Sequence, residues 1–420
     1  MNKSSQHNKI SAVQTIQKKL LGKKLSYQEV YTLMDEIGSK RLGDVLTTYF
    51  VAASFKEGFS TEELFFLTKA MVETGTRLNF KGIVADKHST GGVAGTRTTL
   101  IIVPIIAAAG FKIPKTSSRA ITSPAGTADV MELFSKVTFT PKEIETIVNT
   151  VGGCIVWGGH LGIAPADDVI IRIEEPLSFE SFDKIIVSIM AKKVAVSTNH
   201  LVLDIPVGKT MKIRHFSDAE KVAEKFKTLG KRFGMEVISD VNEVLEPAGR
   251  GVGPMLEARD VLYVLEQKKD RPLKLEAKAL RLAGKVLDIC FKDAGIKKSG
   301  EEEAARILND GTALKKFREI IKAQRGNEHV SSDTLKNPDH HLYIHAPRTG
   351  KVKEINNYNL NTIAKILGAP SDKYAGIYLL KKIDEKVKRK EPIAQFYSSD
   401  RYRLKEAEIT FNNFPIYTIE

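Results

Sequence analysis

Three turn-rich stretches divide the middle of the chain into short apolar segments. These stretches are residues 89–95, 116–126 and 158–168. Strand-like runs at 151–157 and 201–207 and a long apolar, helical run at 100–111 lie between or beside them. Alternation of short strands, glycine-containing loops and helices is typical of α/β proteins. We therefore predict an α/β fold with a largely parallel sheet over residues 81–330.

The segment before this region has a helical pattern. Between residues 10 and 80 apolar residues recur near the 3.6-residue period, and Ser26–Glu29 and Ser60–Glu63 have the spacing of capping boxes. We predict a helical domain over residues 1–80, completed by residues 160–195.

A polar stretch without apolar periodicity, residues 325–340, follows the α/β region and is typical of a linker. Short β-like runs come next, at 342–344, 350–355, 376–380 and 393–397. They predict a small C-terminal α+β domain over residues 340–420. No cysteine and no cluster of acidic ligands accompanies His340, His341 and His345, so we expect no metal there.

Charge and cysteine content limit the function classes. The chain has 64 Lys and Arg against 51 Asp and Glu, a net charge of +13 that is spread along its length. This favours solubility and anionic small molecules over nucleic acid, so we expect no nucleic-acid partner. Cys154 and Cys290 are too few for a disulfide framework or a thiolate zinc site, which fits a reducing cytoplasm. The N-terminus lacks an apolar signal and the longest apolar run has twelve residues, so we expect no membrane partner.

The first glycine-containing stretch, KHSTGGVAGTRTT at residues 87–99, combines groups that bind an oxyanion. Glycines let backbone N–H groups converge, Ser89 and Thr98 offer hydroxyls, and Lys87 supplies a full charge before a helix. The pattern matches neither the P-loop nor the dinucleotide-binding fingerprint. We interpret it as an anion site, with a structural turn and a solvated lysine as the alternative.

The second stretch, TSSRAITSPAGT at residues 116–127, holds six hydroxyl residues and one arginine. Such a loop suits phosphate and sugar hydroxyls, or alternatively caps the helix that follows. In open α/β sheets ligands collect beside loops at the carboxyl ends of strands, so two such loops favour a shared ligand site.

Two further stretches carry polar candidates. In GGHLGIAPADD at residues 158–168, Asp167 and Asp168 suit metal binding or acid–base chemistry, or cap a helix, and His160 is a weaker candidate. In SIMAKK at residues 188–193, Ser188 and Lys192 are four residues apart and share a helix face. They suit a polar substrate, with a solvated lysine pair as the alternative.

These motifs resemble the class II nucleoside phosphorylases, the thymidine and pyrimidine-nucleoside phosphorylases, and are closer to the AMP phosphorylase branch. KHSTGG resembles the phosphate loop of the family. The segments that resemble the AMP phosphorylase branch are TSSRAITSPAGTAD, WGGHLGIAPADD, SIMAKKVA, DIPVG and GRGVGPMLEARD. The resemblance runs from about residue 10 to residue 420. It implies helical, α/β and C-terminal α+β domains in a homodimer. It also implies phosphorolysis, in which inorganic phosphate is a co-substrate and no organic cofactor or metal is needed.

The resemblance also assigns roles to residues of this chain. Positions that hold the attacking phosphate match Lys87, Ser89, Thr98, Ser117 and Thr127. Substrate contacts match Gly92, Ser118, Arg119, Ala120, Ile121, Thr122, Ser123, Thr127, Ser188 and Lys212, and Lys212 is a candidate for binding a substrate 5′-phosphate. The proton donor of the branch is an aspartate after PLSI, whereas here Glu180 follows PLSF. We expect Glu180 and Lys87 to be catalytic.

The chain departs from thymidine phosphorylases where a tyrosine and an arginine contact the pyrimidine. Ile171 and Glu174 stand at those positions unless a gap moves Arg172 into place. We therefore predict phosphorolysis of a nucleoside 5′-monophosphate of the AMP type, giving base and ribose 1,5-bisphosphate. The alternative is a thymidine or pyrimidine nucleoside phosphorylase that uses Arg172 for the base. A more remote alternative is a phosphoribosyltransferase of the same fold.

Overall fold

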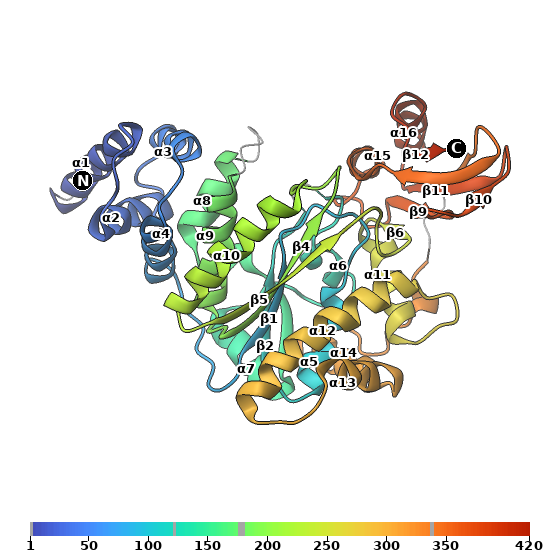
Figure 1. Ribbon diagram of the computed structural model, residues 1–420, viewed down its shortest axis with the longest axis horizontal. Helices are drawn as coiled ribbons and strands as arrows, with labels where there is room; N and C mark the ends of the chain where they lie inside the picture. The colour runs from blue at the N-terminus through green and yellow to red at the C-terminus, as the bar shows by residue number, and fades with distance from the viewer. Residues whose placement is uncertain (1–2, 121–122, 175–180, 337–339) are drawn as a thin grey trace.

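The computed structural model describes residues 3–120, 123–174, 181–336 and 340–420 (Figure 1). Its central strands are β1 Ala85–Ser89, β2 Ile113–Ser117, β3 Gly153–Trp157, β4 His200–Val207 and β5 Glu236–Glu243. They form parallel ladders of order β1-β4-β5 and β2-β3. A parallel bridge between Val84 and Lys112 joins the two ladders. The predicted α/β class with a largely parallel sheet is thus confirmed.

Helices cover both faces of this sheet. They are α5 Thr99–Ala108, α6 Thr127–Met131, α7 Pro141–Val151, α10 Phe216–Arg232, α11 Pro254–Leu265, α12 Leu273–Ala294, α13 Gly300–Asn309 and α14 Thr312–Ala323. Successive residues of a strand point to opposite faces. Val202 accordingly packs with α5 and α12, whereas Leu201 and Leu203 pack in the core that contains α10.

The apolar run at 100–111 forms the helix α5, as predicted. All its residues from Thr99 to Ala107 are buried, which suits a helix that is apolar on every side. It ends in a Schellman arrangement: Gly110 N–H bonds Ala107 O, Phe111 N–H bonds Ile106 O, and Gly110 has a φ of +93°.

The helical part contains α1 Lys3–Leu20, α2 Tyr27–Gly38, α3 Asp44–Glu57, α4 Thr61–Glu73, α8 Pro165–Glu174 and α9 Phe182–Ala195. Both expected capping boxes are present, at Ser26 and Ser60. Helices α8 and α9 lie beside α2–α4 (Figure 1) and share their apolar core, although α5 to α7 separate them in the sequence. The second half of the helical part therefore arrives only after the first strands of the sheet.

The C-terminal part is an antiparallel α+β unit. Its elements are β6 Gly251–Val252, β7 His340–His345, β8 Gly350–Ile355, α15 Asn357–Ile366, β9 Gly376–Leu379, β10 Lys386–Val387, β11 Pro392–Ser398, α16 Arg401–Asn413 and β12 Tyr417–Ile419. The sheets have the orders β6-β9-β11-β7 and β10-β8-β12. Strand β6 comes from the α/β part, so the GRGVGP segment extends the C-terminal sheet. The buried Lys382 adds a hydrogen bond from Nζ to Gly249 O of 3.0 Å, and the two parts are firmly joined.

The predicted linker is partly docked rather than free. Ser332, in the short turn η3 (Ser332–Thr334), bonds the Glu266 carboxylate at the end of α11 through its backbone N–H and its hydroxyl. Within the described ranges, no helix combines the length and the apolar character that a membrane crossing requires.

Candidate functional site

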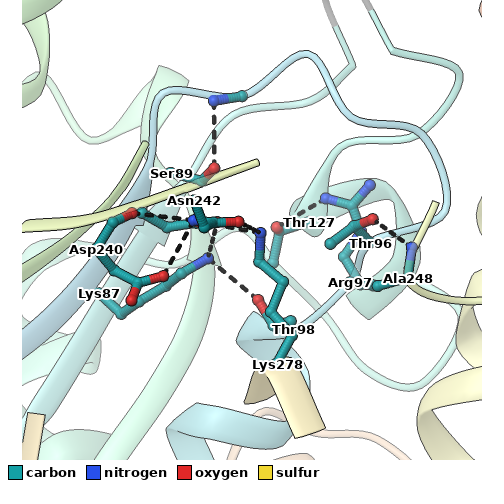
Figure 2. Close-up of polar contacts among 12 residues, drawn as sticks. Lys87, Ser89, Thr96, Arg97, Thr98, Thr127, Asp240, Asn242, Ala248 and Lys278 are labelled. Atoms are coloured by element: carbon teal, nitrogen blue, oxygen red, sulfur yellow. Dashed lines mark hydrogen bonds and ion pairs between the residues drawn. The ribbon is translucent and has the colours of Figure 1, made fainter. Parts of the chain in front are cut away.

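Lys87 is a buried cation in the middle of β1. Its Nζ donates to Thr98 Oγ1 at 3.1 Å and lies 3.6 Å from Asp204 Oδ2 on the neighbouring strand β4 (Figure 2). Burial lowers the pKa of Lys87, and the Asp204 carboxylate opposes this effect. The ammonium is thereby fixed where the first glycine loop leaves the sheet, and the predicted neighbours Lys87 and Thr98 are in contact.

Asp204 is shared between two lysines. Its Oδ1 lies 3.0 Å from Lys278 Nζ on α12 and accepts from Asn242 Nδ2 on β5 at 2.9 Å. Burial alone would raise the pKa of Asp204, but the two ammonium groups and the amide hold it at about 2. One ionised carboxylate faces two ammonium groups, so the cluster keeps an excess of buried positive charge. Such an excess favours binding of an anion.

The loop after β1 depends on glycine. Gly91 and Gly92 have φ angles of +85° and +88°, which side chains rarely adopt. A Cβ on Gly92 would also lie 3.2 Å from Lys212 Cγ. The stem of Lys212 therefore runs beside this loop. Gly91 N–H donates to Ser89 Oγ at 3.3 Å, which ties the loop back to its strand (Figure 2).

Arg97 connects the first loop to the second. It donates from Nε to Glu257 Oε2 at 2.9 Å, from Nη1 to Thr127 Oγ1 at 3.1 Å and from Nη2 to Ala125 O at 2.6 Å. Figure 2 shows the guanidinium directed at the Thr127 hydroxyl. Thr127 begins α6, so the end of the hydroxyl-rich loop is held beside the glycine loop.

Asp129 organises the second loop. Its Oδ2 accepts from the backbone N–H groups of Ala120 at 2.7 Å and Gly126 at 2.9 Å, and its Oδ1 lies 3.1 Å from Arg119. Arg119 also bonds Glu132, whose pKa falls to about 2 because of this guanidinium. The arginine is thus committed to two carboxylates in this structure.

The other predicted residues of this loop are less connected to the anion site. Ser117 Oγ donates to Val156 O at 3.4 Å, Ser118 O accepts from Ala128 N at 3.4 Å, and Ser123 Oγ donates to Ala125 O at 2.9 Å. Ile121 and Thr122 lie outside the described residues, as does Glu180. Their roles stay predictions.

Ser188 and Lys192 share a face of α9, with 3.5 Å between hydroxyl and ammonium. Both contact Asp167 in the first turn of α8, at 2.7 Å and 2.6 Å. Burial raises the pKa of the adjacent Asp168 to about 6, although Lys192 works against this. Both aspartates lie where acidic residues favour a helix start, and Asp167 is already ion-paired. Among the residues that the structure describes, no three His, Cys, Asp or Glu side chains gather as a metal would require.

Arg172 is directed elsewhere. Its guanidinium pairs with Asp44 on α3 at 2.6 Å, and both side chains are more than half exposed. Glu174 bonds Lys184. His160 lies in the short turn Gly158–His160, and His340, His341 and His345 lie on β7. None of the described contacts brings Arg172 to the cluster of Lys87 and Asp204, and its role in base binding stays a prediction.

A second buried cluster lies behind β1 and was not foreseen. Asp86 bonds Lys115 of β2 at 3.0 Å and also pairs with Lys193 of α9. Burial lowers the pKa of Lys193 to about 8, against the attraction of Asp86. Burial and the nearby lysines keep the pKa of His88 well below its usual value, so this imidazole is neutral. Its Nδ1 is buried without a hydrogen-bond partner in the described part of the chain.

Comparisons with known proteins agree with this architecture. Family models match residues 13–75 (glycosyl transferase family, helical bundle domain), 81–314 (glycosyl transferase family, a/b domain) and 351–414 (pyrimidine nucleoside phosphorylase C-terminal domain). AMP phosphorylase 1 of Archaeoglobus fulgidus is 42% identical over 410 residues, which cover 97% of this chain and 80% of the relative. The chain belongs to the nucleoside phosphorylase family. It is a pentosyltransferase.

Other relatives of this phosphorylase carry two kinds of name. AMP phosphorylase of Thermofilum pendens is 42% identical over 399 residues, covering 95% of this chain and 76% of the relative. "Putative thymidine phosphorylase" of Legionella pneumophila (strain Corby) is 41% identical over 400 residues, with the same coverage. Anthranilate phosphoribosyltransferase of Thermus thermophilus shares the fold, with a TM-score of 0.60 at 18% identity, over 74% of this chain and 99% of that chain.

Proposed function

We propose that the enzyme catalyses phosphorolysis of a nucleoside 5′-monophosphate of the AMP type, which gives the free base and ribose 1,5-bisphosphate. The observation that carries this proposal is the presence of two lysines around one glycine loop. Lys87 lies buried at the start of the loop, and the Lys212 stem runs beside Gly92. One cation serves the attacking phosphate and the other serves the 5′-phosphate of the substrate.

The reaction exchanges one bond at C1′ for another. An oxygen of inorganic phosphate attacks C1′ while the bond from C1′ to the base nitrogen breaks and its electron pair goes to the base. Lys87, Ser89 and Thr98 hold the phosphate, whose negative charge stabilises the oxocarbenium-like sugar. Ser188 and Lys192 offer hydrogen bonds to the substrate. The carboxyl group of Glu180 gives the departing base its proton.

Base release from AMP, CMP, UMP, adenosine, uridine and thymidine, measured with and without phosphate, tests the proposal. Phosphate-dependent release from monophosphates supports it. Release from thymidine or uridine alone favours the second candidate, a pyrimidine nucleoside phosphorylase, which the name of the Legionella relative supports. No phosphate-dependent release from any of the six contradicts both, and phosphoribosyl pyrophosphate with magnesium would then be tested.

Lys212→Ala separates the two phosphate-binding roles. We expect KM for AMP to rise at least about tenfold and KM for adenosine to change little, because only AMP carries the 5′-phosphate. Lys209→Ala is a matched control, since Lys209 is three residues away and its side chain is largely exposed. Equal effects of Lys212→Ala on both substrates would remove the assigned role.

We further infer a cytoplasmic homodimer. Val45 and Tyr49, one helical turn apart on α3, are 72% and 56% exposed, and Leu21 beside the end of α1 is 71% exposed. Helices α1 and α3 pack against each other, and exposed apolar residues on neighbouring helices are a candidate protein interface. Light scattering after size-exclusion chromatography should give twice the mass of the chain, and Val45→Asp with Tyr49→Asp should give the monomer mass. A monomeric native protein would contradict this inference.

A further inference from the structure

The C-terminal part reaches into the phosphate loop through one side chain. Asn357 is the first residue of α15, and its side-chain amide makes two hydrogen bonds to the loop. Nδ2 donates to Gly92 O at 2.6 Å, and Oδ1 accepts from Ala94 N–H at 3.0 Å. Asn357 is only 2% exposed. One buried amide therefore hydrogen-bonds to the backbone on both sides of Val93.

The rest of the loop is held by other contacts. Gly95 O accepts from Gly249 N–H at 2.8 Å, and Thr96 Oγ1 accepts from Ala248 N–H at 3.1 Å (Figure 2). These bonds fix the outgoing end of the loop. Asn357 holds the tip, next to the two glycines with positive φ angles. Glycine gives this tip many accessible conformations, so the amide determines which of them is populated.

We propose that Asn357 is a positioning residue for the attacking phosphate, acting through the loop rather than on the ligand. This inference rests on the proposed function, because it takes the loop at residues 89–95 as the phosphate cradle. An amide suits the position because one group must donate to a carbonyl while the other accepts from an N–H. A carboxylate of the same shape would face Gly92 O with an acceptor and would repel it.

The mechanism predicts a specific kinetic signature. If the loop spends only about a tenth of its time in the competent conformation, the apparent Kd for phosphate rises about tenfold. Once phosphate saturates the site, the loop is held by the ligand and the reaction proceeds as before. Asn357→Ala should therefore raise Kd and KM for phosphate about tenfold and change kcat at saturating phosphate less than about threefold.

The experiment measures inorganic phosphate binding by calorimetry on the nucleotide-free protein, and then KM for phosphate and kcat with AMP. The variants are Asn357→Ala and Asn357→Asp. The aspartate variant keeps size and shape, but it replaces the donor by an acceptor and adds a negative charge, so it remains informative if the alanine variant does not fold. We expect Asn357→Asp to weaken phosphate binding at least as much as Asn357→Ala.

Asn356→Ala is the matched control. Asn356 caps the same helix by accepting from Asn359 N–H, and none of its side-chain bonds in the described structure reaches the loop. It should destabilise α15 slightly and leave phosphate binding unchanged. Equal weakening by Asn356→Ala, or wild-type phosphate affinity in both Asn357 variants, would overturn the inference while the proposed function stands. If the wild-type protein releases base without needing phosphate, that result contradicts the proposed function itself, whatever the Asn357 variants do.

Discussion

Replacing Asp204 by asparagine tests how the enzyme keeps Lys87 charged. The substitution keeps shape and removes one negative charge that lies 3.6 Å from Lys87 and 3.0 Å from Lys278. Two buried ammonium groups then lack their carboxylate. Burial already lowers the pKa of Lys87, and the negative charge of Asp204 is the largest effect that raises it again. We expect the pKa of Lys87 to fall further in Asp204→Asn.

The magnitude follows from the carboxyl itself. The pKa of Asp204 is about 2 in the folded protein against 3.8 ordinarily, which corresponds to roughly 2–3 kcal/mol. Because the folded-state pKa is the lower one, this stabilisation is complete above about pH 5 and is lost as the pH falls through 4 toward 2. Leaving buried ammonium groups unpaired costs about 3–5 kcal/mol in other proteins. We expect Asp204→Asn to lower the free energy of unfolding at pH 7 by about 3 kcal/mol.

The assay is KM for phosphate between pH 6 and pH 9 in wild type and variant. At each pH we take the ratio of the KM of the variant to the KM of the wild type. The titration of phosphate itself cancels in this ratio, because it affects both proteins equally. The ratio should grow at least about tenfold over this range, because the variant loses the Lys87 charge at lower pH. Asp240→Asn is the control, since Asp240 pairs with Arg281 and Lys285 at 2.8 Å and 2.7 Å instead of with Lys87. A ratio that does not change with pH would refute the reasoning.

Three further predictions concern stability. Arg97→Ala leaves the buried carboxylate of Glu257 without its guanidinium partner and should lower the free energy of unfolding by about 3 kcal/mol at pH 8. The loss should be smaller at pH 5, because the carboxyl can accept a proton there. Urea unfolding at both pH values checks this. Burial raises the pKa of Asp168 to about 6, so the folded state binds more protons than the unfolded chain between about pH 4 and 6 and its stability falls as pH rises through that range. Asp168→Asn should therefore add about 1 kcal/mol at pH 7.5, after allowance for partial exposure, and nothing near pH 4 in the same assay. Gln324→Leu removes amide bonds of 2.7 Å and 2.9 Å to the N–H and C=O of Ile155 and should cost about 2–3 kcal/mol, measured by thermal unfolding, with KM for phosphate unchanged.

Local patterns in the sequence were sufficient for several elements, but not for the strands β1, β2 and β5. The helix α5 follows from a run of apolar residues over 100–111, and the two capping boxes need only residues three positions apart. Lys87 and Thr98 are eleven residues apart, and a glycine loop between a strand and a helix brings them together. Such features can be predicted because they depend on residues close together in the sequence.

The partners of Lys87 and of the loop could not be found in this way. Asp204 lies in the run 201–207, which is otherwise apolar, and such an isolated charge in a buried run is the one signal the sequence offered. Lys278 sits on a helix that packs against that strand, and Asn357 is 265 residues from Gly92. Their positions depend on how whole elements pack, so no spacing in the chain encodes them. Arg172 pairs with Asp44 in this structure, and its role in base binding stays a prediction.

The two buried clusters share one charge pattern. Asp204 pairs with Lys87 and Lys278, and Asp86 pairs with Lys115 and Lys193, so each carboxylate faces two ammonium groups. A buried charge without a full partner is costly, so an anion bound beside Lys87, as we propose for phosphate, would supply negative charge that the Asp204 cluster lacks. Such binding would also stabilise the folded chain, because a ligand that binds only the folded state adds to its stability. The proposed effect of Asn357 belongs to the same balance, since its amide already restrains the tip of the loop.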